Sequence, residues 1–278
     1  MKGQGLVYLK SQVDDISSKT LDSIIATSYM GKEICYLEEV DSTNEEAKRL
    51  ARQGVKEGYM VIADKQVSGK GRLGRSWDSP SGTGIWMSLV LRPEISPDKA
   101  SQITLIGGLA MCEAIRQVTH LDAKIKWPND IVINGKKVCG ILTEMNAKVN
   151  DINYIVIGVG VNVNSTNFSQ ELPFATSLKL ESKMEYKRKD IIKVFLEKFE
   201  AYYIPYKTLP TLEYILPIYK AYCITLEEQV KIMDSTKEYI ATPLDITLDG
   251  KLVIKTKNNQ EQTIASGEVS VRGIYGYV

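Results

Sequence analysis

Apolar residues follow two different periods along the chain, and stretches of the two kinds alternate. Alternation of apolar and polar residues, or a short apolar run, is typical of β-strands, whereas apolar residues recurring every three to four positions are typical of amphipathic helices. The first pattern predicts strands over residues 6–9, 34–40, 59–64, 85–91, 123–127, 131–133, 136–145 and 154–163. The second predicts helices over residues 17–30, 41–54, 97–119, 189–206 and 212–222.

Turn residues separate the strands of the middle region. Asn134-Gly135 is a strong two-residue hairpin signal between two of them. Strands that follow one another through hairpins pair antiparallel, so we expect an antiparallel or mixed sheet backed by helices, which is the α+β class. Gly158 and Gly160 lie inside a predicted strand, where glycine marks a bulge or a ligand that approaches the backbone.

After Cys223 the sequence pattern changes, and it predicts short strands separated by turns. Asp249-Gly250 is a second hairpin signal within this part. Strands are expected over residues 229–233, 238–248, 252–256, 262–265 and 269–273. Such a run of short strands over about 50 residues predicts a separate small β-barrel.

Bulk composition is that of a globular protein and argues against several classes. The 278 residues are 44% hydrophobic and 25% charged, with a net charge of +1, so no overall field attracts nucleic acid or a membrane. Four widely spaced cysteines argue against a zinc site or disulfide framework and suit a reducing cytoplasm. The single histidine, His120, is expected to end a helix, which argues against a catalytic triad. We find no secretory-type leader and no long apolar run.

Candidate chemistry begins in the stretch from Gly69 to Trp77, which holds three glycines, three cations and a tryptophan. Glycines let a backbone approach a ligand, and N–H groups with cations can bind its negative charge. This combination predicts a loop for a phosphate attached to a planar group. A mobile, solvated basic loop is the alternative. The G-x-G-x-x-G spacing is no dinucleotide fingerprint, because the residues 78–84 that follow cannot form a helix.

Two further polar clusters are Ser42-Thr43-Asn44, at the start of a predicted helix, and Lys126–Asp130 followed by Lys137. From the residues alone the first cluster is best explained as helix capping. A polar cluster at a helix N-terminus can also recognise a small polar ligand. The second cluster can be explained as a strand followed by a polar turn.

Together these clusters resemble the biotin protein ligases over nearly the whole chain. The resemblance rests on five motifs in family order, which are D-S-T-N, Q-x-x-G-x-G-R-x-G-R-x-W, K-W-P-N-D, K-x-x-G-I-L-x-E and G-x-G-x-N. It implies a catalytic domain related to the class II aminoacyl-tRNA synthetases, followed by an SH3-like barrel. It also implies an enzyme that forms biotinyl-5′-AMP from biotin and ATP and then transfers biotin to a lysine of biotin carboxyl carrier protein.

The resemblance assigns residues to three overlapping roles. Biotin contacts fall on Ser42, Thr43, Asn44, Gln66, Lys70, Gly71, Arg72 and Lys137. Nucleotide contacts fall on Arg72, Arg75, Trp77, Asn129, Lys137 and Asn162. Catalysis falls on Lys137, Arg72 and Asp130. Lys137 would hold the carboxylate and the bridging oxygen, and Asp130 would contact metal or orient the incoming amine.

The implied cofactors are ATP and Mg²⁺, with biotin as substrate and the metal carried by the nucleotide rather than by a protein metal site. The implied partner is the carrier protein of acetyl-CoA carboxylase. Family members also dimerise, so a homodimer is possible here. We expect a cytoplasmic protein with no membrane contact.

The chain departs from its relatives in places. Lys70 stands where many relatives have arginine, and Leu73 replaces a frequent second basic residue. Residues 1–31 are expected to be the remnant of a winged helix-turn-helix domain and its linker, 32–224 the catalytic domain, and 225–278 the barrel. Bifunctional members repress biotin genes with that first domain, of which about 60 residues would be missing. We therefore expect no specific DNA binding by this chain.

Two alternatives stay open. A lipoate protein ligase shares the fold and the adenylation chemistry, but usually has an R-x-S-G-G-G-type loop with a nearby histidine, which this chain lacks. A repressor that only senses biotinyl-5′-AMP would need a recognition helix with a basic face.

Overall fold

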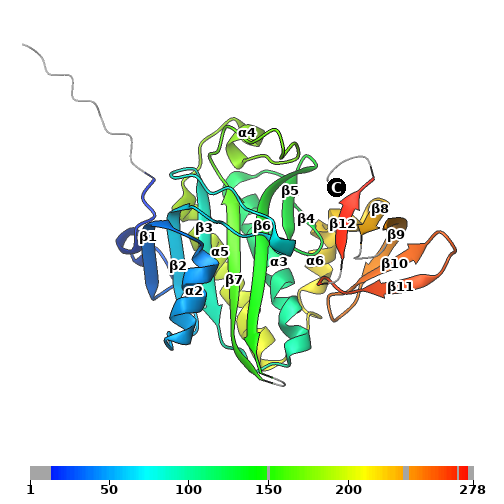
Figure 1. Ribbon diagram of the computed structural model, residues 1–278, viewed down its shortest axis with the longest axis horizontal. Helices are drawn as coiled ribbons and strands as arrows, with labels where there is room; N and C mark the ends of the chain where they lie inside the picture. The colour runs from blue at the N-terminus through cyan, green and yellow to red at the C-terminus, as the bar shows by residue number, and fades with distance from the viewer. Residues whose placement is uncertain (1–13, 149–150, 234–237, 268, 275–278) are drawn as a thin grey trace, which may run out of the picture.

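The structure of the protein, a computed structural model, describes residues 14–148, 151–233, 238–267 and 269–274. A seven-stranded sheet forms the centre of the larger part, and a five-stranded sheet lies beside it at the C-terminal end (Figure 1). The strand predicted over residues 6–9 lies outside the described residues.

The larger sheet is mixed, as predicted. Its strands are β1 (Ile34–Val40), β2 (Met60–Gln66), β3 (Gly84–Leu91), β4 (Lys124–Lys126), β5 (Asp130–Ile133), β6 (Lys136–Ala147) and β7 (Ile152–Asn162). They lie in the order β1-β2-β3-β7-β6-β5-β4, with β1 and β2 parallel and the other pairs antiparallel. The predicted hairpin at Asn134-Gly135 joins β5 to β6, and both turn residues have positive φ.

Helices cover both faces of this sheet. α2 (Thr43–Arg52) packs on one face through its small residues Ala47 and Ala51. α3 (Ala100–Thr119) and α5 (Arg188–Thr208) pack against each other on the opposite face (Figure 1). Alternate residues of the strands point to the two faces, so each strand contributes to both cores. The helices predicted in these three places are confirmed.

Short helices and helical turns connect the main elements. They are α1 (Ser18–Asp22), η1 (Arg72–Gly74), η2 (Pro97–Lys99), α4 (Leu178–Ser182), α6 (Leu216–Tyr222) and η3 (Ile224–Leu226). Three of them, η1, α4 and η3, are missing from the sequence prediction.

The prediction of one helix over residues 17–30 is wrong, because α1 ends at Asp22. Beyond it the chain turns around the buried carboxylate of Glu200 in α5. That carboxylate accepts hydrogen bonds from the three successive backbone N–H groups of residues 28–30, at 2.7 to 3.0 Å. This long-range contact binds N–H groups that a helix would use, and it outweighs the local periodicity.

The smaller sheet comprises β8 (Val230–Met233), β9 (Glu238–Ile246), β10 (Leu252–Thr256), β11 (Glu261–Ile264) and β12 (Ser270–Gly273). Its order is β11-β10-β9-β8-β12, and every pair is antiparallel. The strands predicted after Cys223 are therefore confirmed, and with them a barrel-like C-terminal domain. None of the helices in the described ranges has both the length and the apolar character that a membrane crossing requires.

Candidate active site

A pocket opens on the α2 face of the larger sheet, and glycines form its floor. Gly158 of β7 faces Asn44, whose Oδ1 lies 1.9 Å from the place a Cβ would take. Gly140 of β6 and Gly160 of β7 are register partners, and Trp77 lies across both. A Cβ at Gly160 would lie 2.7 Å from the indole ring. The strand glycines thus allow two side chains to lie against the backbone.

The polar end of the pocket is the start of α2. Thr43 donates from its backbone N–H and its hydroxyl to Gln66 Oε1, at 2.8 and 3.1 Å. The Ser88 hydroxyl donates to Asn44 Oδ1 at 2.6 Å. Ser42 occupies the N-cap position, but its side chain makes no capping hydrogen bond. Helix capping therefore does not explain this cluster. Its three side chains are buried and line the pocket.

The loop between β2 and β3 covers one side of the pocket as a small hairpin. Gly71 N–H donates to the Arg75 carbonyl at 2.7 Å, and Trp77 N–H donates to the Gly69 carbonyl at 2.8 Å. Leu73 at its tip has a φ of 57°, a left-handed conformation that disfavours a bulky side chain. The tip is exposed, whereas Gly69 at the base is buried. The loop is thus folded back on itself, and a merely solvated loop does not describe it.

Arg72 fixes this hairpin to two other parts of the chain. Its guanidinium donates to Asn129 Oδ1 at 2.7 Å, to the Val269 carbonyl at 3.3 Å and to the Ser266 carbonyl. The Asn129 amide in turn donates to the Ile141 carbonyl at 3.0 Å. The side chain of Arg72 therefore joins the loop, the turn before β5 and the C-terminal domain.

The opposite wall carries a cation. Lys137 Nζ lies 2.6 Å from Asp130 Oδ1 and 5.1 Å from the centroid of the Trp77 ring. The side chains of Lys137 and Asp130 are only 23% and 12% exposed, so water screens their attraction less than at the surface. The wall thus offers a partly desolvated ammonium to a negatively charged group in the pocket.

Lys126 lies behind this wall, paired in register with Asp130. Burial lowers the pKa of the Lys126 ammonium to about 7, the positive charges of Lys137, Arg272 and Arg75 add to the lowering, and the carboxylate of Asp130 opposes it. Burial has the largest effect on this pKa, because it removes water from the ammonium and so disfavours its charged form. Lys126 is therefore poised to change charge near neutral pH.

Ten of the residues predicted for the site line this one pocket. They are Ser42, Thr43, Asn44, Gln66, Lys70, Gly71, Arg72, Trp77, Asn129 and Lys137. Three others do not line it. Arg75 is exposed on the loop, Asp130 contacts Lys137, and Asn162 is buried with its amide donating to the Thr176 carbonyl at 3.0 Å.

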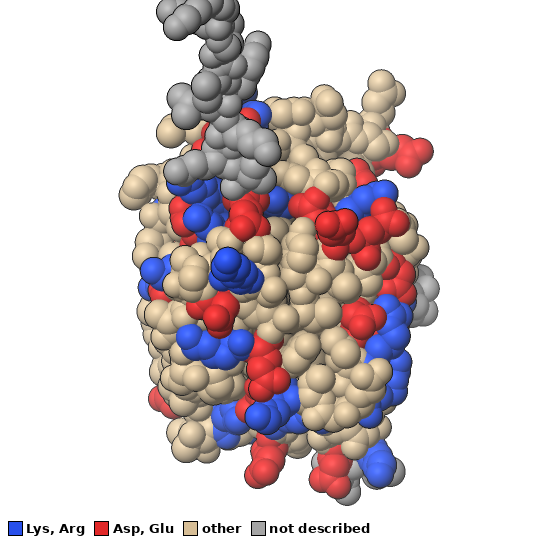
Figure 2. All heavy atoms as spheres, turned by 90° about the vertical axis from the view of Figure 1, so that its left-hand side faces the viewer, with Lys and Arg blue, Asp and Glu red and all other residues tan. Residues whose placement is uncertain are grey.

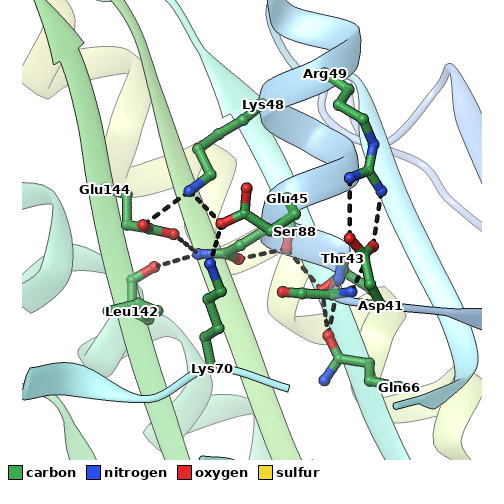
Figure 3. Close-up of polar contacts among 12 residues, drawn as sticks. Asp41, Thr43, Glu45, Lys48, Arg49, Gln66, Lys70, Ser88, Leu142 and Glu144 are labelled. Carbon is green, nitrogen blue, oxygen red and sulfur yellow. Dashed lines mark hydrogen bonds and ion pairs between the residues drawn. The ribbon is translucent and has the colours of Figure 1, made fainter. Parts of the chain in front are cut away.

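Sequence reasoning missed the residues that support the polar end, which are Glu45, Lys48, Ser88 and Glu144 (Figure 3). Glu144 is the last letter of the K-x-x-G-I-L-x-E motif, and Lys48 lies one helical turn from Asn44, so both carried a signal. Within the described ranges, no group of three or more His, Cys, Asp or Glu side chains is placed to hold a metal ion.

Family comparisons agree with this geometry. Residues 36–162 match the biotin/lipoate A/B protein ligase family, and residues 225–272 match the biotin protein ligase C terminal domain. The fold and pocket thus define a ligase of the biotin and lipoate class.

Curated relatives and solved structures narrow this class. The bifunctional ligase/repressor BirA of Bacillus subtilis is 35% identical over 89% of this chain and 76% of its own length. That of Bacillus spizizenii is 37% identical over 84% of this chain and 72% of its own length. The biotin protein ligase of Aquifex aeolicus, solved with biotin and ATP, is 29% identical with a TM-score of 0.76, over 87% of this chain and 99% of that one. The chain belongs to the biotin protein ligase family.

Proposed function

We propose that this chain activates biotin with ATP and transfers it to a lysine of biotin carboxyl carrier protein. A biotin carboxylate oxygen attacks the α-phosphorus, and pyrophosphate leaves. The lysine amine then attacks the acyl carbon of biotinyl-5′-AMP, AMP leaves, and the amine loses a proton. The observation that carries the proposal is one pocket with amide and hydroxyl groups at one end and Lys137 and Arg72 at the other.

The polar end suits the ureido ring of biotin, which needs paired donors and acceptors beside an apolar slot. Ser42, Thr43, Asn44 and Gln66 supply the polar groups there. Lys70 and Gly71, in the hairpin above, would close the biotin site. The sheet floor and Val159 supply an apolar surface for the ring and chain.

The cationic end suits two anions that repel each other, the carboxylate and the α-phosphate. Lys137 would hold the carboxylate and the bridging oxygen, and Arg72 would share the developing charge. Asp130, at 2.6 Å from Lys137, would orient that ammonium and then the incoming amine. We assign the nucleotide to Arg72, Arg75, Trp77, Asn129, Lys137 and Asn162.

Mg²⁺ is best assigned to the nucleotide. Magnesium in phosphoryl-transfer sites usually keeps several waters and binds substrate phosphates with one or two carboxylates. The described residues fit that arrangement, because Asp130 stands near the cationic end but no larger carboxylate cluster does. When bound, the metal would neutralise triphosphate charge.

The carrier protein of acetyl-CoA carboxylase is the proposed protein partner. The cytoplasm is the proposed location, where the four free thiols would stay reduced.

A homodimer is also proposed. β1 is an edge strand among the described strands, and its face shows basic and acidic side chains interspersed (Figure 2). Sedimentation with and without biotin and ATP would test this; a monomer in both would contradict it.

The enzymatic proposal is tested by incubating the protein with ATP, Mg²⁺, an apo carrier domain and either labelled biotin or labelled lipoate. We expect ATP-dependent label on the carrier lysine with biotin and none with lipoate. Labelling by lipoate instead would favour the lipoate ligase alternative. No label from either would contradict the proposal.

We further propose that this chain does not bind a DNA operator specifically. In the described residues before β1, the one helix is α1, with five residues and one lysine, Lys19. Groove reading needs a helix or ribbon that delivers side chains to base edges. A mobility-shift titration at low salt with biotin and ATP checks this. A tight, sequence-specific complex would support the repressor alternative.

A further inference from the structure

A continuous series of polar contacts joins the floor of the pocket to the loop that covers it (Figure 3). Asn44 Nδ2 donates to Glu144 Oε2 at 2.8 Å, and Glu144 Oε1 accepts from Lys48 Nζ at 3.0 Å. Lys48 Nζ also lies 2.6 Å from Glu45 Oε1. That same Glu45 oxygen accepts from Lys70 of the loop. The series runs from β6 across α2 to the hairpin.

The first contact fixes the side chain of Asn44. An asparagine amide presents a donor on one side and an acceptor on the other, and only its partners determine which way it points. The hydroxyl of Ser88 donates to its oxygen at 2.6 Å, and the carboxylate of Glu144 accepts from its nitrogen. Because an ionised carboxylate cannot donate, Glu144 excludes the flipped amide.

In the middle of the series, one cation lies between two carboxylates. Lys48 stands between Glu45 and Glu144, and its side chain is only 19% exposed. The hydrogen bonds from Lys48 and Lys70 hold the pKa of Glu45 below its usual value, despite partial burial. If the cation of Lys48 were removed, the carboxylates of Glu45 and Glu144 would repel each other. This repulsion would weaken the contact of Glu144 with Asn44 and that of Glu45 with Lys70.

The last contact gives Lys70 a partner on the protein. The side chain of Lys70 is 48% exposed, so an isolated ion pair there would be weak. Its partner Glu45 is already held by Lys48, and a pre-positioned partner reduces the entropy lost on contact. The loop thus closes onto an ordered group rather than onto a mobile one.

We propose that Glu144, Lys48 and Glu45 are positioning residues that couple the orientation of Asn44 at the biotin end to the closed position of the Lys70 loop. The proposal rests on the proposed function. A ligand that binds the oriented amide would favour the closed loop, and the closed loop would favour the oriented amide, because such coupling is reciprocal. This series of contacts, here called the relay, would slow the release of bound ligand and would not contact the reacting atoms.

The first experiment replaces the bridge. Lys48→Met keeps an unbranched side chain, one atom shorter than that of lysine, and removes its charge. Lys48→Arg keeps the charge. Lys231→Met is the matched control, because Lys231 forms a surface ion pair with Glu238 at 2.7 Å in the C-terminal domain. The measurements are the KM for biotin, the KM for ATP, kcat, and the rate at which labelled biotinyl-5′-AMP leaves the enzyme.

We expect Lys48→Met to raise the biotin KM and the release rate about threefold to tenfold, with kcat and the ATP KM changed less than about twofold. Lys48→Arg should recover most of this loss, and Lys231→Met should behave as the wild type. Unchanged biotin KM and release, or an equal loss in both KM values and kcat, would overturn the proposal.

A second experiment measures the coupling itself. Glu144→Gln and Lys70→Met change the two ends of the series, which do not contact each other. If the relay couples them, their combined effect on the biotin KM departs from the product of the single effects by at least about twofold. That departure should vanish in the Lys48→Met background. If the effects of Glu144→Gln and Lys70→Met simply multiply, while the wild-type enzyme labels the carrier, the coupling is rejected and the proposed function stands. If the wild-type enzyme does not label the carrier, the proposed function itself is rejected.

Discussion

At the scale of single residues, position decides what a common side chain can do. Lys126 of β4 and Lys137 of β6 lie on the two strands that flank β5, and Asp130 of β5 is the register partner of the first and the ion-pair partner of the second. Lys137 reaches the pocket and its partner carboxylate, whereas Lys126 is 5% exposed and has a lowered pKa. Lys137 is therefore a candidate ligand for an anion, whereas Lys126 is a buried group that gains or loses its proton near neutral pH.

Removal of Lys137 tests its assigned role. We expect Lys137→Ala to lower the rate of biotin-dependent pyrophosphate exchange about a hundredfold to a thousandfold, because a cation aimed at developing negative charge is lost. Thermal unfolding should show that the variant remains folded. Wild-type exchange rates in the folded variant would contradict the assignment of Lys137.

Lys126 predicts a pH dependence of stability. Burial lowers the pKa of Lys126 in the fold to about 7 from its usual value of 10.5, so between these values the unfolded chain binds more protons than the native one. Stability from this group therefore rises with pH across that window. The free energy of unfolding of the wild type, minus that of Lys126→Met, should increase from pH 7 to pH 10 by on the order of 1 kcal/mol per pH unit. A constant difference in urea titrations would show that Lys126 keeps its charge.

Sequence alone identified most pocket residues but not their physical roles. Ser42 and Asn44 look like capping residues, since polar side chains before an apolar run usually cap a helix. The structure shows instead that Asn44 lies on Gly158, a residue more than a hundred positions away. No local pattern encodes that contact. The ordered motifs could indicate the site, but the partners Glu144 and Lys48 required the fold.

At the scale of elements, periodicity predicted strands and long helices well and failed where a distant group competes with the local pattern. The turn that follows α1 is bound by Glu200, which lies in α5. The glycines of α3 show the same limit. A glycine inside a helix can mark close packing against a neighbouring element, and the sequence does not distinguish Gly107 from Gly108. In the structure a Cβ at Gly107 would lie 2.6 Å from Ile157, whereas a Cβ at Gly108 would have nothing within 4 Å.

These two glycines make a matched pair of variants. Gly108→Ala should stabilise the protein by about 0.5 to 1 kcal/mol, because alanine loses less backbone entropy in a helix and meets no neighbour. Gly107→Ala should destabilise it by about 1 to 3 kcal/mol, because α3 or the Ile157 side chain must shift in a packed core. Denaturant titrations of both variants measure the difference. Equal effects would contradict the packing of α3 on the sheet.

At the scale of the whole molecule, the C-terminal domain contributes to the architecture of the site. Arg72 donates from the loop between β2 and β3 to the carbonyls of Ser266 and Val269. The turn at Gly250 docks on the catalytic domain, where a Cβ would lie 2.9 Å from Leu105 and 3.1 Å from Leu212. The sequence predicts this turn from Asp249-Gly250 but cannot predict where it docks, because docking depends on α3.

Trp127 of the K-W-P-N-D motif contacts the C-terminal part of the chain through two hydrogen bonds. It is 1% exposed, its indole N–H donates to the Gly250 carbonyl at 3.0 Å, and its backbone N–H donates to Thr225 Oγ1 at 2.9 Å. Trp86 makes a comparable contact within the catalytic domain, with its indole N–H donating to the Pro80 carbonyl at 3.3 Å. The two tryptophans therefore allow the effect of an interdomain hydrogen bond to be separated from that of a buried ring.

Replacement of each tryptophan by phenylalanine should destabilise the protein, because the smaller ring leaves a gap in the core. Trp127→Phe also leaves the carbonyl of the buried Gly250 without its donor, at a cost of about 1 to 3 kcal/mol, whereas Pro80 is exposed and its carbonyl can bind water. Only Trp127→Phe should loosen the domains, because only its lost partner lies across the interface. We expect faster proteolysis between residues 223 and 230 in Trp127→Phe, together with weaker adenylation, since Arg72 loses its fixed carbonyls when the domain moves. Trp86→Phe should be cut there at the wild-type rate. Equal cleavage of the two variants would mean that Trp127 stabilises the catalytic domain without holding the C-terminal domain in place.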